Sequence, residues 1–88
     1  MKPSDKFLLR KIGEQNFLVP LGTKVLDFNA LVSLNSVGVF IWEMICSENE
    51  IKSNEIISSV IENFNVEEVT ARQDVENFLF DLKKMGIL

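Results

Sequence analysis

The side chains best suited to chemistry in this 88-residue chain are carboxylates and one thiol, since the sequence has no His and no Tyr. Imidazole general-base catalysis, a Cys–His nucleophile and a His/Cys metal cage are therefore excluded. Glu67 and Glu68 are adjacent, but acidic residues are typical of a first helical turn, where they offset the helix dipole. Cys46 follows apolar helical positions and has no basic neighbour in sequence, so we expect an unreactive thiol. We predict no enzymatic activity, no cofactor and no metal site.

Length and charge narrow the function further. Apolar residues make up 47% and charged residues 25% of the chain, which predicts one small globular domain over residues 1–88 without a deep enclosed pocket. The net charge of −4 disfavours nucleic-acid binding, which depends on phosphate neutralisation. Residues 1–24 hold five basic and two acidic groups, whereas residues 25–88 hold four basic and eleven acidic ones. We interpret this asymmetry as two differently solvated faces.

No targeting or membrane segment is expected. The apolar residues 7–9 are followed at once by Arg10 and Lys11, which is unlike a signal peptide. The longest uncharged stretch, residues 28–42, is too short and too polar to cross a bilayer. With one lone thiol, the sequence predicts a cytoplasmic protein.

Apolar and turn residues in the first third of the chain predict three strands. Residues 7–12 and 17–21 flank a polar turn that starts at Gly13, which is typical of a hairpin. Pro20 belongs at a strand end or a sheet edge because it has no N–H to donate. A third strand is predicted at residues 30–34. One of its faces is wholly apolar and is expected to face the core, namely Ala30, Val32 and Leu34.

The period then changes to that of helices. The first helix is expected to follow an N-cap at Asn35 or Ser36 and to end near Cys46 and Ser47. Its predicted buried positions are Val37, Phe40, Ile41, Met44 and Ile45. After a mostly polar loop at residues 48–52, Ser53 is expected to cap a second helix that ends at Asn65. Its predicted buried positions are Ile56, Ile57, Val60, Ile61 and Phe64.

The third helix is the longest. A capping box at Thr70 and Gln73, or at Asn65 and Glu68, is expected to start it, and Gly86 to end it. Its predicted buried stripe consists of Ala71, Val75, Phe78, Leu82 and Met85. Phe80 falls opposite this stripe. Three strands followed by three helices make an α+β domain with a three-stranded antiparallel sheet.

Two features favour binding over catalysis. The third strand carries no charge and no proline, so its edge is open to a guest strand, to a second copy or to another part of the fold. On the third helix, Leu79 is expected on the shoulder of the buried stripe, with Arg72, Glu76 and Lys83 beside it. Together these residues would form a wall with an apolar base and a charged rim, suited to a peptide.

Three segments in this order resemble the PqqD family. Residues 34–42, LNSVGVFIW, resemble its L-N-x-x-G/A-x-x-I-W signature. Residues 53–57 resemble the start of its middle helix. Residues 74–88, DVENFLFDLKKMGIL, are similar to its D-V-x-x-F-L-x-x-L-x-x-x-G-I/L-L ending. The segment from Gly22 to Asn29 is longer than the family pattern, which favours a relative serving another peptide over the quinone-pathway member.

The resemblance implies a winged helix-turn-helix-like fold of the kind called a RiPP recognition element. Such a domain binds the leader segment of a ribosomally made precursor peptide and presents it to a modifying enzyme, often a radical SAM enzyme. It implies that the leader adds to the third strand beside the third helix. The implied peptide-binding residues are Leu31, Val32, Ser33, Leu34, Arg72, Val75, Glu76, Leu79 and Lys83.

Two alternatives stay open at this point. A winged-helix DNA-binding regulator fits the topology, but residues 53–64 carry Glu55 and Glu62 and no basic residue. A homodimer could form through the open edge or through Phe80.

Overall fold

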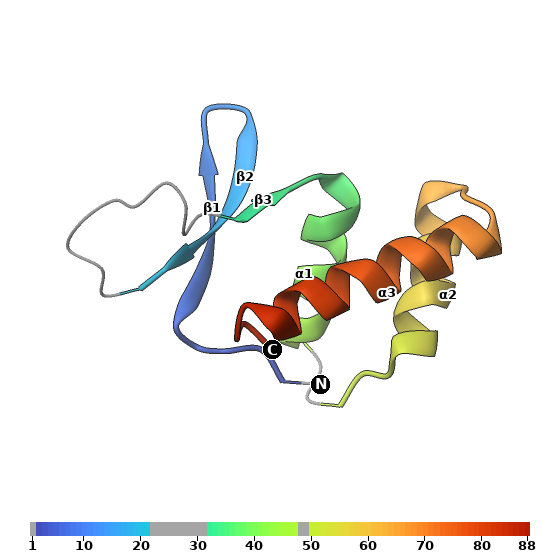
Figure 1. Ribbon diagram of the computed structural model, residues 1–88. Helices are drawn as coiled ribbons and strands as arrows, with labels where there is room; N and C mark the ends of the chain where they lie inside the picture. The colour runs from blue at the N-terminus through green and yellow to red at the C-terminus, as the bar shows by residue number, and fades with distance from the viewer. Residues whose placement is uncertain (1, 22–31, 48–49) are drawn as a thin grey trace.

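The predicted order of three strands and three helices is confirmed. The structure is a computed structural model that describes residues 2–21, 32–47 and 50–88 (Figure 1). Its elements are β1 (Phe7–Ile12), β2 (Gln15–Pro20), β3 (Val32–Leu34), α1 (Ser36–Ser47), α2 (Ser53–Phe64) and α3 (Glu68–Lys84). The described strands form one antiparallel sheet in the order β1-β2-β3, so β2 is central.

A two-residue turn sets the register of the hairpin. Ile12 pairs with Gln15, which leaves Gly13 and Glu14 in the turn. Gly13 has a φ of +65°, a conformation that glycine adopts without steric cost. Pro20 occupies the last position of β2, as predicted.

The described part of the third strand has the expected alternation. β3 comprises Val32–Leu34, and the predicted positions Ala30 and Leu31 lie outside the described residues. Leu34 is buried and Val32 half-buried, whereas Ser33 between them is exposed. The face with Val32 and Leu34 therefore lies on the core, as the apolar pattern predicted.

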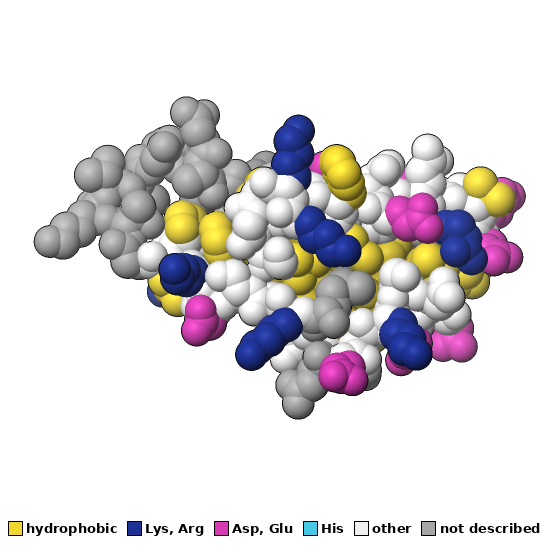
Figure 2. All heavy atoms as spheres, turned by 60° about the horizontal axis from the view of Figure 1, so that its bottom comes forward, with side chains coloured by type: hydrophobic (Ala, Val, Ile, Leu, Met, Phe, Trp, Pro, Cys, Tyr) yellow, Lys and Arg dark blue, Asp and Glu magenta, His cyan; other side chains and the backbone are white. Residues whose placement is uncertain are grey.

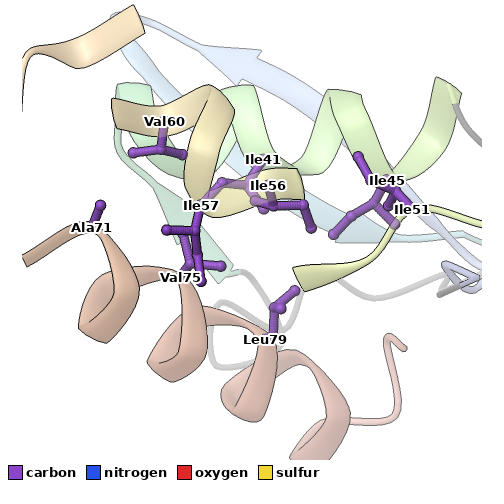
Figure 3. Close-up of a cluster of buried hydrophobic side chains, with 9 residues drawn as sticks. All are labelled: Ile41, Ile45, Ile51, Ile56, Ile57, Val60, Ala71, Val75 and Leu79. Atoms are coloured by element: carbon purple, nitrogen blue, oxygen red, sulfur yellow. The ribbon is translucent and has the colours of Figure 1, made fainter. Parts of the chain in front are cut away.

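Two apolar clusters hold the elements together. The larger cluster joins the three helices, and Figure 3 shows the α3 side chains Ala71, Val75 and Leu79 directed toward α2. The smaller cluster joins the sheet to α1, to the end of α3 and to the chain beyond it. Its buried members are Leu18, Leu34, Trp42, Leu82 and Ile87. Phe78 packs against both clusters and so connects the helical layer to the sheet layer.

The helix starts match the predictions only in part. The Asn35 Oδ1 atom accepts a 2.8 Å hydrogen bond from the Gly38 N–H, which confirms the N-cap of α1. The cap predicted at Ser53 for α2 and both caps predicted for α3, at Thr70 or at Asn65, are wrong, since Lys52 and Glu67 occupy those positions without a side-chain hydrogen bond. Apolar packing supports the start of α2 in place of a polar cap. Ile51, in the segment expected to be mostly polar, is buried with Ile56, an arrangement typical of a hydrophobic staple.

The buried positions of the first two helices are confirmed in part. Gly38, Ile41, Trp42 and Ile45 are buried in α1, and Ile56, Ile57 and Val60 in α2. The other predicted positions are half-buried and pack against the larger cluster, namely Val37, Phe40, Met44, Ile61 and Phe64. Asn65 ends α2 in the left-handed conformation, as expected of a C-cap residue that tolerates it.

The buried stripe of α3 is rotated from the predicted one. Leu79 is only 6% exposed, so its predicted place on the shoulder of the stripe is wrong. Met85 is 49% exposed and Phe78 half-buried, although both were predicted within the stripe. The difference arises because the side of α3 that packs against α2 carries Ala71, Val75 and Leu79, all members of the larger cluster. Phe80 is exposed, as predicted.

The end of α3 folds back onto the core. The Gly86 N–H donates to the Lys83 carbonyl and the Ile87 N–H to the Leu82 carbonyl, which is a Schellman motif. Ile87 is fully buried, and its carbonyl accepts a 2.7 Å hydrogen bond from the Ser4 N–H. The two ends of the chain accordingly lie close together in Figure 1.

We expect Gly86→Ala to lower the free energy of unfolding by about 1 kcal/mol, because Gly86 has a φ of +76°. No atom would clash with an added Cβ, so the loss would come from the backbone conformation. Urea unfolding measures this loss. Gly86→Asn should cost less, since Asn tolerates the left-handed region. Equal stability of wild type and Gly86→Ala would contradict the motif.

Candidate functional site

The outer edge of β3, like that of β1, is unpaired in the described part of the chain. β3 pairs with β2 on one side, and no strand among residues 2–21, 32–47 and 50–88 pairs with it on the other. Such an edge offers backbone donors and acceptors to an incoming strand.

The register shows which backbone groups of β3 face outward. In a hairpin with a two-residue turn, the residues flanking the turn exchange hydrogen bonds, and every second pair along the strands does the same. Ile12 with Gln15 and Arg10 with Phe17 are therefore hydrogen-bonded pairs. The N–H and C=O of Phe17 therefore point toward β1. They are not available to Ser33, the residue opposite Phe17 in β3. The N–H and C=O of Ser33 consequently point away from β2, to the open edge.

A hollow begins where β3 ends. It has a volume of about 300 Å³ and lies between the start of α1 and one flank of α3. The residues lining it are Asn35, Val37, Gly38 and Ile41 with Asp74, Asn77, Phe78 and Asp81. A Cβ on Gly38 would lie 3.4 Å from the Leu34 Cβ and 3.4 Å from the Asn35 Oδ1, so an alanine would be in van der Waals contact with both residues. The hollow thus begins directly after the last residue of β3.

The helix wall predicted from sequence lies on the other flank of α3. At about 100° per residue, Arg72, Glu76 and Lys83 fall on one side of the buried stripe, and Asp74 and Asp81 on the opposite side. Arg72 and Glu76 line a different hollow, of about 520 Å³. The structure therefore does not bring the predicted wall to the hollow beside β3.

The remaining predicted site residues are partly buried in the core, partly exposed and partly outside the described residues. Val75 and Leu79 are buried in the helical cluster and offer no free surface. Arg72 forms a 3.3 Å ion pair with Glu68 one turn earlier on α3, and both side chains are exposed. Leu31 lies outside the described residues.

Sequence reasoning missed Asp74, Asn77, Phe78 and Asp81 as lining residues. Their spacing places them along one flank of a helix, but periodicity alone does not say which flank adjoins the sheet. Phe78 was the one signal in the sequence for this flank. It was predicted within the buried stripe, and it lies at the border of that stripe.

Other chemistry has little support in the described residues. No cluster of three or more potential metal-ligating residues occurs within the described ranges. Cys46 is exposed, and partial burial and then the charge of Glu43 raise its pKa above the ordinary value. Its thiol therefore stays protonated near neutral pH. A search of the described helices finds none with the length and apolar character of a membrane span.

The acidic balance of the helices is visible on the surface. On the face drawn in Figure 2, most Asp and Glu side chains gather at the end where α2 meets the start of α3. Lys and Arg side chains are spread over the whole face. This surface has no continuous basic stripe of the kind that nucleic-acid backbones require.

A three-stranded antiparallel sheet with an open edge, followed by three helices, defines a winged-helix-like recognition domain. The family model described as "Coenzyme PQQ synthesis protein D (PqqD)" matches residues 17–88, and the chain belongs to this family. A search of curated proteins found no match.

A solved structure shares the fold over the whole chain. It is described as "TbiB1 in Complex with the TbiA(beta) Leader Peptide". The two chains superpose with a TM-score of 0.73 at 26% sequence identity, covering 100% of this chain and 94% of the other. That neighbour was therefore solved with a leader peptide. Neither comparison supports the DNA-binding alternative.

Proposed function

We propose that this chain is a non-catalytic adaptor that binds the leader segment of a ribosomally synthesised precursor peptide. The leader adds as a strand to β3, and the adaptor presents the peptide to a modifying enzyme, with a radical SAM enzyme as the expected class. The outward N–H and C=O of Ser33, deduced from the strand register, carry this proposal. Membership of the PqqD family and the similarity to a domain in complex with a leader peptide support it.

The mode of binding follows from the edge. Backbone hydrogen bonds would supply affinity with little dependence on sequence, while alternate side chains of the guest would meet the adjoining hollow and confer selectivity. An adaptor of this kind needs no catalytic group, in agreement with the absence of His from the chain.

Amide exchange and chemical shifts of the ¹⁵N-labelled chain test the proposal. The titrants are synthetic leader segments of precursor peptides encoded beside genes for peptide-modifying enzymes. We expect the exposed Ser33 amide to exchange more slowly on binding, with shifts along β3 and at the hollow beside Gly38 and Phe78. Shifts confined to α2 or to the β1 edge, with Ser33 unprotected, would contradict strand addition at β3.

A further inference from the structure

The inference concerns the chemistry of the peptide that β3 accepts, and it rests on the proposed function. Side chains directly opposite one another in neighbouring strands lie on the same face of the sheet. Guest residues opposite Val32 and Leu34 therefore share the face that packs on the helices. Because Phe78 packs beside that face and also lines the hollow, alternate guest side chains meet the hollow.

The hollow combines an apolar floor with an acidic rim. Val37 and Phe78 are half-buried and supply apolar surface, while Asp74 and Asp81 are exposed at its border. In the described part of the chain the one ion pair joins Arg72 to Glu68, so neither of these carboxylates has a cationic partner there. Asn77 lies between them on the same flank.

The helix dipole of the free protein does not account for these two carboxylates. Asp81 lies three residues before Lys84, the last residue of α3, close to the negative end of the helix dipole, where a carboxylate is unfavourable. Asp74 lies in the interior of α3 and caps no helix end. Two carboxylates with no ion pair in the described part of the chain, at the border of the hollow, are available to a cation in the guest.

We propose that the peptide recognised by this domain presents a Lys or Arg to one of these two carboxylates, Asp74 or Asp81, with an apolar residue two positions away over Phe78. Alternate residues of a strand are about 6.6 Å apart. Asp74 and Phe78, one turn apart on α3, are separated by about 6 Å along the axis. One guest strand therefore matches both features of the hollow.

Selection from random peptides tests this chemistry without knowledge of the natural precursor. Dodecapeptides displayed on phage are selected on the immobilised full chain at low salt. Each binder is then assayed against Ser33→Pro, so that peptides depending on the β3 edge are separated from others. Among the edge-dependent binders we expect enrichment of Lys or Arg two positions from an apolar residue.

Variants of the rim give the quantitative arm. The double variant Asp74→Asn with Asp81→Asn should bind a selected, fluorescently labelled peptide about 3- to 10-fold more weakly than wild type does. When the Lys or Arg of that peptide is replaced with Gln, the two proteins should bind it equally well. The matched control is Glu55→Gln with Glu62→Gln, which removes two exposed carboxylates with the same seven-residue spacing on α2 and should leave affinity unchanged. Raising salt should weaken wild-type binding more than binding by the rim variant.

Two outcomes would overturn the inference in distinguishable ways. Edge-dependent binders without basic residues, indifferent to the rim variant, would reject the charge preference and leave strand addition standing. A selection in which no binder depends on Ser33 would reject the proposed function and the charge preference together.

Discussion

Ser33→Pro is expected to weaken leader-peptide binding at least about tenfold while leaving the fold intact. The N–H of Ser33 points to the open edge, so proline removes a hydrogen bond to the guest, worth about 0.5–1.5 kcal/mol, and its ring obstructs the guest backbone. The ladder to β2 is spared, since its hydrogen bonds come from Val32 and Leu34. Fluorescence anisotropy with a labelled leader peptide measures the loss.

The matched control for this prediction is Ser33→Thr. Threonine keeps the N–H and favours strands, so binding should stay within about twofold of wild type. Circular dichroism and urea unfolding establish that both variants are folded. A folded Ser33→Pro protein with wild-type affinity would refute strand addition at β3.

Leu79→Ala is expected to lower the free energy of unfolding by about 2–4 kcal/mol, because it leaves a cavity among packed side chains. Leu79 is 6% exposed and belongs to the cluster that joins α3 to α1 and α2. For a domain of this size the loss corresponds to a fall in melting temperature of roughly 10 °C or more. Thermal and urea unfolding measure it.

The neighbouring residue provides the control. Phe80 is 65% exposed, so Phe80→Ala removes a larger side chain and should change stability by less than about 0.5 kcal/mol. If Leu79 instead belonged to a solvent-facing wall for peptides, Leu79→Ala would weaken binding and leave stability unchanged. The two variants together therefore distinguish a core residue from a surface one.

The distribution of roles in this small domain has a physical basis. Strand addition uses backbone groups, and most side-chain substitutions leave these groups in place. The β3 edge can therefore keep its ability to bind a strand while the residues lining the hollow change. Packing of Phe78 against both apolar clusters fixes the flank of α3 relative to the sheet. Selectivity can then change through exposed rim residues such as Asp74 and Asp81 at little cost to stability.

Local sequence determined the elements and most of their ends. The turn after Ile12, the cap at Asn35, the end of α2 at Asn65 and the end of α3 at Gly86 each depend on neighbouring residues only. The structure confirms them, although the turn comprises only Gly13 and Glu14 and β2 begins at Gln15, earlier than predicted. The alternation of apolar and polar residues likewise determined which face of β3 lies on the core. The motif order was sufficient to identify the family.

Tertiary packing decided which flank of α3 adjoins the open edge. The sequence offers two polar flanks, one with Arg72 and Glu76 and one with Asp74 and Asp81, and helical periodicity treats them alike. Their roles differ because α3 crosses α2 in an orientation that buries Leu79 and leaves Phe78 at the sheet. That orientation depends on how side chains distant in sequence fit together, so residue spacing within one helix does not contain it.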